Sequence, residues 1–335
     1  MAWSSGGSVC RRSIRIETNR ESRLPRLRLL SYSNQVVDAV LVLQACVLDR
    51  GSRVTPELFT VVSDETVSDH RYVHVVPSDS ATFARRLAES LEKHYFDRDT
   101  SRQALVRAAE ELSVFSGNSF NLEDIEAALH DELDAALPAD LRDRPEPLGV
   151  QRSEFAEIVA SEVLKEVFGT SVPASRIRHK EVPDQQTRGA DIVGLEQLEA
   201  MHAADLILSE VKASQDRVSP PGVVADMVTK LTSLLTRRRT LLQELIWVRD
   251  HASEEYAEIC GTLCATYSLK KETFRIIIAP ILVRSAATHS DDDPGVFRTH
   301  PHHFGRSVRW VSIVIDADLL QIARQVYRIA REGQP

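Results

Sequence analysis

The chain has 335 residues, of which 43% are hydrophobic and 27% are charged, proportions that are usual for a globular protein. The formal net charge of −8 excludes a protein that coats nucleic acid through bulk electrostatics, because such binding needs a basic face. It does not exclude an enzyme whose metal ions supply local positive charge, or one that a partner delivers to DNA. No apolar run approaches the roughly 20 residues of a membrane span, so no membrane association is expected.

The first 30 residues are rich in Arg and Ser and lack the apolar stretch of a secretory signal, so residues 1–30 predict a flexible arm. The cysteines do not form a credible disulfide framework. Buried thiols in a reducing, cytoplasmic setting are the expectation for them. These cysteines are Cys10, Cys46, Cys260 and Cys264.

Residues 31–145 are expected to form an α+β region. The run 71–79 predicts a strand, whereas the apolar run 35–48 fits either a strand or a buried helix. Three amphipathic helices follow, and Asn121 is suited to cap the last of them, with Asp124 as the capping acid. The predicted helices cover residues 81–96, 101–115 and 121–137.

The segment 137–149 carries three prolines and a glycine among charged residues, which predicts a domain boundary. A second domain is expected over 150–332, and it begins with a helix that Ser153 would cap and that ends at Gly169. The predicted order of elements is α-β-β-β-α-β-β-α, which indicates an α/β fold with a mixed central sheet flanked by helices. After the first helix, these elements cover 175–182, 189–196, 205–214, 223–266, 273–285, 308–315 and 317–332.

Acidic residues and a lysine fall at the ends of these elements. Asp191 opens the second strand of the domain, and Glu210 and Lys212 lie near the end of the third. Residues at i and i+2 of a strand share a face, so Glu210 and Lys212 point the same way. Glu154 and Glu157 share a face of the first helix. Glu157 is the favoured helix acid because apolar residues flank it, whereas Glu154 is expected at the surface.

Carboxylates that converge from adjacent strands form a hard-oxygen site suited to Mg²⁺, for which Mn²⁺ can substitute. Such a metal polarises a phosphodiester oxygen and lowers the pKa of a bound water. A neighbouring lysine can position that water or stabilise charge on the phosphate. Only seven of the 41 basic residues are lysines, so a lysine at position 212 indicates a chemical role rather than a contribution to solubility. The alternative, without a catalytic role, is that Glu210 and Lys212 form a surface ion pair at a strand end.

This pattern resembles the PD-(D/E)XK nuclease superfamily, on "GAD" ending at Asp191, "EVK" from Glu210 to Lys212, and the acid-bearing helix before them. The resemblance implies Asp191 and Glu210 as metal ligands, with Glu157 assisting the metal or the water. It implies Lys212 as the catalytic lysine. Ala190 replaces the proline that is usual before the first strand acid.

A narrower resemblance, over residues 150–332, is to the HamA nuclease subunit of Hachiman anti-phage defence systems. It rests on "SEFAEIV", "TRGADIVGLE", "LILSEVKAS" and "IIIAPILVRS". It implies a bacterial DNA nuclease that works with a helicase partner. Ser209 stands where a glycine would be expected before the glutamate. Two alternatives remain open: an inactive nuclease-fold subunit that binds or regulates, and an autonomous restriction-type endonuclease.

Other polar motifs carry less weight. His300, His302 and His303, with His289 upstream, predict a solvated loop rather than a zinc site, because no cysteine or H-E-x-x-H helix accompanies them. The arginines 237–239 fit a phosphate contact or an exposed helix face equally well. The basic run 176–180 and Arg188 are placed to rim a cleft before Asp191, or to protect a strand edge. There is no phosphate-cradling G-x-x-x-x-G-K-[ST] loop, so the chain is not itself an ATPase.

Overall fold

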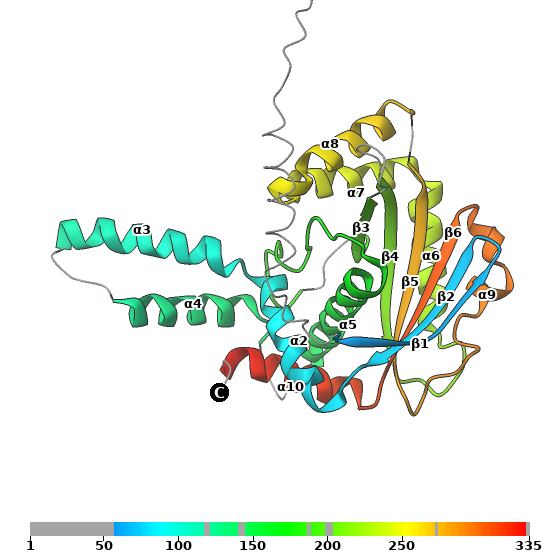
Figure 1. Cartoon of the computed structure of the whole chain (residues 1–335), viewed down its shortest axis with the longest axis horizontal. Helices are drawn as coiled ribbons and strands as arrows, with labels where there is room; N and C mark the ends of the chain where they lie inside the picture. Colours follow the sequence, from blue (N-terminus) through cyan, green and yellow to red (C-terminus); the bar gives the residue numbers. More distant parts are fainter. Residues whose placement is uncertain are drawn as a thin grey trace, which may run out of the picture. The chain divides into compact units, whose positions relative to one another are not determined.

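Six strands form one mixed sheet in the order β1-β2-β6-β5-β4-β3 (Figure 1). In this computed structural model the described residues are 57–116, 121–139, 145–185, 189–197, 204–271 and 274–332. The expected arm 1–30 and the run 35–48 lie outside them. The strands are β1 (Phe59–Val67), β2 (His70–Pro77), β3 (Ile192–Gln197), β4 (Ala204–Ser214), β5 (Ile276–Ser285) and β6 (Ser307–Ile315).

The four central strands, β2, β6, β5 and β4, run parallel to one another, and β1 and β3 close the two edges in antiparallel pairing. Every residue of β5 is buried. A parallel strand covered on both faces is expected to be continuously apolar, as the Ile-rich start of β5 is. Pro280 lies in this strand, opposite Glu210 of β4. The pairing of β5 with β6 is interrupted between Ile278 and Ile281, where the proline cannot donate a hydrogen bond.

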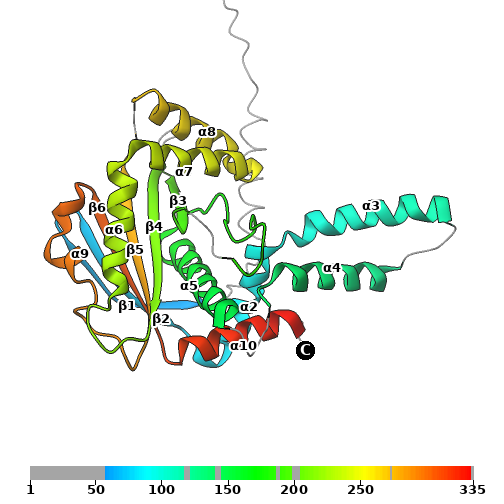
Figure 2. The same cartoon turned by 180° about the vertical axis from the view of Figure 1, so that it is seen from behind.

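Helices cover both faces of the sheet, so the predicted α/β class with a mixed sheet is confirmed. One apolar core joins the sheet to α2 (Ser80–Tyr95), α5 (Pro145–Phe168) and α10 (Leu319–Glu332). A second core joins the other face to α6 (Val223–Thr236), α7 (Arg238–His251) and α8 (Glu254–Ser268). Figure 2 shows α5 and α6 on either side of β4.

The boundary predicted at 137–149 does not separate two domains in the described structure. Residues Pro56–Pro335 form one compact unit. Strand β2 pairs with β6, and α2 packs in the same core as α5 and α10. The proline-rich segment was misleading because its second half begins α5, where prolines are tolerated in the first turn. Ser153 is therefore inside that helix and does not cap it.

The other predicted helices are present. The predicted cap of α4 (Leu122–Ala136) is a complete capping box, in which Asn121 and Asp124 each accept a hydrogen bond from the other's backbone N–H. Helix α4 pairs with α3 (Arg98–Ser116), and the two extend away from the sheet (Figure 1). The helical region after β4 is divided into three helices. Two short helical turns, α9 (Val296–Thr299) and η1 (Pro301–Phe304), precede β6.

The strand predicted over 175–182 is wrong: this segment is a series of turns. Its basic side chains reach away to other elements. Arg176 donates to the carbonyl of Ala190, and Lys180 forms an ion pair with Glu154. These partners hold the segment against α5 and the start of β3 without strand pairing. The neighbouring residue Ser171 alone makes an isolated bridge, to Leu195 of β3.

Cys260 and Cys264 are buried free thiols in α8, as predicted. Burial raises the pKa of the Cys260 thiol to about 11, so this thiol is protonated at neutral pH. Cys10 and Cys46 lie outside the described residues. Among the helices that the structure describes, none is both long and apolar enough to cross a membrane.

Candidate active site

Asp191 and Glu210 lie side by side because β3 and β4 are antiparallel. Ile192, the first residue of β3, is paired with Ser209, so the residue before it lies next to Glu210. Asp191 Oδ2 accepts a hydrogen bond of 2.7 Å from the backbone N–H of Val211. This bond fixes one oxygen of Asp191 against β4, while the other, Oδ1, faces a lysine of α6.

Glu210 is fully buried, yet it lies between charged groups. Lys212, two residues along the same strand face, places its Nζ 2.7 Å from Glu210 Oε1. Burial and the nearby Asp191 carboxylate raise the pKa of Glu210 from 4.5 to about 7, against the opposing effect of two lysines. A buried glutamate with such a pKa is typical of functional sites.

The second of these lysines, Lys230 of α6, was not predicted as a site residue. Its Nζ lies 2.8 Å from Asp191 Oδ1 and 2.6 Å from Glu210 Oε2. Burial alone would lower the pKa of Lys230, but the two carboxylates outweigh it and raise that pKa. A single helical lysine forms no motif. The scarcity of lysine that singled out Lys212 was the one signal that could have found it.

Glu157 is brought to the same place from α5. Its Oε2 is buried and has no hydrogen-bond partner among the described residues. Burial raises the pKa of Glu157 well above its usual value, and the carboxylates of Asp191, Glu154 and Glu210 add to this effect. Glu157 and Asp191 line the same small hollow. An unsatisfied buried carboxyl oxygen is costly to stability, and this oxygen is free to accept a bond from a ligand.

Glu154 does not lie at the surface, contrary to expectation: it is 1% exposed. Lys180 Nζ lies 2.5 Å from its Oε1, and the hydroxyl of Tyr95 donates to its Oε2. The Tyr95 hydroxyl also lies 2.7 Å from that of Tyr327 in α10. Glu154 is therefore satisfied by a structural network, which leaves Glu157 as the helix acid of the site.

Two further residues hold the peptide that precedes Asp191. Glu244 of α7 accepts a 3.1 Å hydrogen bond from the N–H of Ala190, and Arg176 Nε donates a 3.0 Å bond to the Ala190 carbonyl. Arg176 and Glu244 also form an ion pair, and the Arg176 guanidinium lies over the ring of Trp247. We call Arg176 and Glu244 the clamp, because together they fix both sides of Ala190.

Gly189 is required next to the clamp. Its φ is +101°, which favours glycine. A Cβ at this position would lie 2.7 Å from atoms of both Arg176 and Glu244. The glycine of "RGAD" thus lets the clamp approach the backbone and orient Asp191. Arg188, the other residue expected at the rim, lies outside the described residues.

The arginines 237–239 were expected to contact phosphate or to lie on an exposed helix face, and Arg238 does neither. Arg237 lies between α6 and α7, and Arg238 begins α7. Arg238 donates to the carbonyl of Tyr267 and stacks over its ring at 4.3 Å. This side chain therefore joins α7 to α8, and its contacts are structural.

The acidic residues fit a hard divalent cation. Asp191, Glu210 and Glu157 supply carboxylate oxygens, which Mg²⁺ prefers to nitrogen or sulfur ligands. The unsatisfied Oε2 of Glu157 and the raised pKa of Glu210 both indicate missing positive charge. Lys230 Nζ supplies part of that charge from a position between two of the carboxylates.

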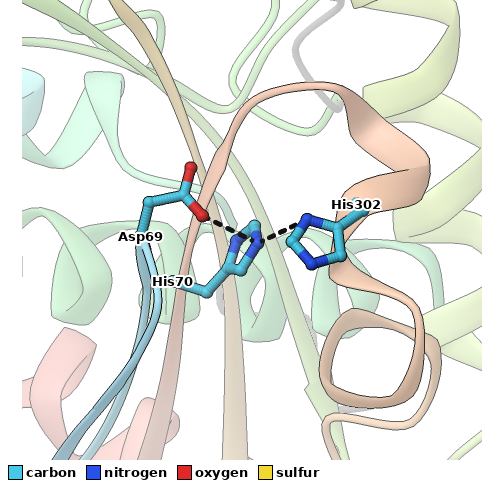
Figure 3. Close-up of side chains that lie close together, drawn as sticks. All are labelled: Asp69, His70 and His302. Carbon is cyan, nitrogen blue, oxygen red and sulfur yellow. Dashed lines mark hydrogen bonds and ion pairs between the residues drawn. The ribbon is translucent and has the colours of Figure 1, made fainter.

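A second polar cluster lies where β2 and β6 begin (Figure 3). His70 Nε2 lies 3.1 Å from Asp69 Oδ1 and 3.4 Å from His302 Nδ1. Among the described residues, this is the one set of three His, Cys, Asp or Glu side chains whose ligand atoms all lie within 4.8 Å of one another. Glu157, Asp191 and Glu210 are more widely spread, with Lys230 between two of them.

The hydrogen bonds of His70 oppose a metal at this second cluster. His70 Nδ1 accepts a 3.1 Å hydrogen bond from the backbone N–H of Val308. Neutral imidazole has one protonated nitrogen, so the proton lies on Nε2, the atom that faces Asp69 and His302. A ligating histidine instead donates from its other nitrogen. The loop histidines predicted as solvated agree with this: His302 and His303 are exposed.

The match to a protein-family model covers more of the chain than the resemblance over residues 150–332. A family model described as HamA matches residues 55–292. This range includes β1, β2 and the helices before the predicted boundary, which the narrower resemblance had left out. No curated protein matches the chain. Because the matched range contains more than half of the 335 residues, the chain belongs to the HamA family.

Proposed function

We propose that this protein is a Mg²⁺-dependent deoxyribonuclease and the effector of a Hachiman anti-phage defence system that works with a helicase partner. One observation carries the proposal: Glu157, Asp191 and Glu210 approach one another from α5, β3 and β4, and Glu157 keeps an oxygen unsatisfied. Membership of the HamA family supports the biological setting. The arrangement with Lys212 resembles the sites of PD-(D/E)XK nucleases.

In this proposal, different residues bind the cation and contact the substrate. Asp191 Oδ1, Glu210 and Glu157 would hold the cation, while Asp191 Oδ2 remains bonded to Val211. Burial raises the pKa of Glu157 well above its usual value, which favours retention of its proton when no cation is bound. Cation binding would release this proton, which makes affinity increase with pH.

Lys212 is the group placed to meet the substrate. Its side chain is 31% exposed, whereas its partner Glu210 is fully buried. Nζ therefore stands at the open side of the site, where it can hold a phosphate oxygen or the attacking water. When bound, Mg²⁺ supplies a Lewis acid for the phosphodiester and makes a coordinated water more acidic.

The alternative, a nuclease-fold subunit that binds without cutting, has one observation in its favour. Lys230 Nζ bridges Asp191 and Glu210 and so compensates their charge without any metal. The two functions differ in whether Asp191 and Lys212 matter for DNA cleavage or only for stability.

DNA cleavage by purified protein tests the proposal. Supercoiled, linear and single-stranded DNA would be incubated with Mg²⁺ or Mn²⁺, with and without the helicase partner. We expect metal-dependent cutting that Asp191→Asn and Lys212→Ala abolish. Asp250→Asn and Lys271→Ala are matched controls, because both residues are exposed and lie outside the site. Intact DNA under every one of these conditions would refute the nuclease.

A further inference from the structure

A basic groove lies next to the acidic site. It has a volume of about 490 Å³ and is bounded by the ends of α2 and α5, the segment 172–179, and the junction of α7 and α8. Its basic lining residues come from all four of these places. They are Lys93, His94, Lys165, Arg178, His179 and His251, and we call this the basic groove. Burial lowers the pKa of both His94 and His179, so the positive charge of the groove comes mainly from Lys93, Lys165 and Arg178.

The charge of the groove is opposite to that of the chain, whose formal net charge is −8. Asp97 is the one acidic residue among the described residues that line it. Lys93 forms no ion pair with any described residue. Arg178 donates to the backbone carbonyl of Lys93, an uncharged partner that leaves the positive charge of the guanidinium uncompensated. Lys165 and His94 share an acidic partner, Glu162, at 2.8 Å and 3.1 Å.

The groove adjoins the small hollow of the acidic site. The small hollow that Glu157 and Asp191 line shares four lining residues with the basic groove. The shared lining places a ligand in the groove beside the acidic site. The shared residues are His94, Val172, Ala174 and Ser175.

We propose that the basic groove binds backbone phosphates of the nucleic-acid strand whose neighbouring phosphodiester is presented to Glu157, Asp191 and Glu210. This inference rests on the proposed function. Three carboxylates at the reacting centre oppose the approach of a polyanion, so cations beside the reacting phosphate would add to the affinity that Lys212 can supply. An acidic segment of a partner protein would also fit the charge. The common wall with the acidic site favours nucleic acid, because only a substrate has to reach both hollows.

Equilibrium binding tests the groove independently of cleavage. Fluorescence anisotropy with labelled single-stranded and duplex oligonucleotides would use full-length Asp191→Asn protein, over a range of salt concentrations. Each phosphate contact contributes a slope of about 0.9 to log K against log salt. Lys93→Ala with Arg178→Ala should lower the slope by about 2 and weaken binding at about 0.1 M salt by roughly tenfold or more.

Two variants separate charge from structure. Arg178→Lys, with Lys93 unchanged, keeps the positive charge, so its salt slope should stay close to that of the parent protein. Arg328→Glu, on the exposed face of α10, is a matched control that should leave binding unchanged. Melting temperatures equal to that of the parent protein would show that the variants fold.

The outcomes are distinct for the two proposals. If the wild type cuts DNA and the double variant binds and cuts with unchanged Kd and KM, the groove proposal fails while the nuclease stands. If the protein binds DNA through Lys93 and Arg178 but never cuts, the groove stands and the nuclease fails. No binding of either oligonucleotide by the parent protein would also overturn the groove.

Discussion

Two polar clusters lie on the same sheet, and they differ in how far the protein itself satisfies them. At Asp69, His70 and His302, both ring nitrogens of His70 have partners: Nε2 faces Asp69 and His302, and Nδ1 accepts a hydrogen bond from Val308. At the acidic site, Glu157 keeps an unsatisfied buried oxygen, and burial raises the pKa of Glu210 to about 7. Close spacing of ligand atoms therefore identifies the first cluster, whereas missing positive charge identifies the second.

The largest contrast should appear in catalysis. Replacing a metal-ligating carboxylate removes charge at the reacting centre, so Glu157→Gln should reduce Mg²⁺-dependent DNA cleavage by at least about 100-fold. His302→Ala should leave the rate within about twofold, since the residue is exposed and lies outside the site. Initial rates on one DNA substrate, with both variants at the same concentration, measure this. Equal losses in the two variants would contradict the assignment.

The next contrast is in stability without metal. The folded pKa of Glu210, about 7, exceeds 4.5, so the folded state binds more protons between these pH values. The contribution of Glu210 to the stability of the wild type therefore falls as pH rises through this window. Above pH 7 the cost is about 3 kcal/mol at 1.36 kcal/mol per pKa unit.

Glu210→Gln should consequently be more stable than the wild type at about pH 8 in a chelator, by up to about 3 kcal/mol, and the gain should shrink toward about pH 5. Urea unfolding at the two pH values measures it. His302→Ala is the control, with no such gain. A Glu210→Gln protein that is less stable than the wild type at the higher pH would show that the lysine pairs outweigh burial.

A smaller effect is expected at the clamp. Glu244→Ala removes the acceptor for the N–H of Ala190 and leaves Arg176 without its acidic partner. Looser placement of Asp191 should lower kcat by about tenfold with little change in KM. Glu244→Gln keeps an oxygen acceptor and should recover part of the loss. Wild-type kcat in a folded Glu244→Ala protein would leave the clamp with a structural role alone.

The smallest effect is expected for zinc at the histidine cluster. Binding through His70 Nε2 would require a shift of the proton to Nδ1, against the N–H of Val308. Added Zn²⁺ should therefore change the melting temperatures of the wild type and of His302→Ala equally, to within about 1 °C. Differential scanning calorimetry of the wild type and His302→Ala measures this. A zinc-dependent rise that His302→Ala abolishes would make the cluster a metal site.

The sequence predicts the strongly periodic elements well, whereas the edge strand β1 and the domain boundary are predicted poorly. Strand β1 escapes prediction because all but its first residue are exposed and its sequence mixes valines with polar residues without a regular alternation. The turns 175–182 resemble a strand locally, and only their distant partners, Ala190 and Glu154, decide otherwise. The proline-rich segment predicts a boundary, but the pairing of β2 with β6 spans more than 200 residues of sequence.

The acidic site was predictable where its spacing is local, as in Glu210 and Lys212 on one strand face. Glu157 followed from its apolar neighbours. The burial of Glu154 was not predictable, because its partners Tyr95 and Lys180 come from other parts of the chain. Lys230 and Glu244 carry no local pattern at all. Their positions depend on how α6 and α7 pack against β3 and β4.

Binding of Mn²⁺ tests most directly whether the acidic site holds a divalent cation. Titration followed by electron paramagnetic resonance would compare the wild type, Glu210→Gln and His302→Ala in the absence of DNA. Our account predicts saturable binding that strengthens with pH, is lost in Glu210→Gln and is retained in His302→Ala. Binding that persists in Glu210→Gln and disappears in His302→Ala would contradict it.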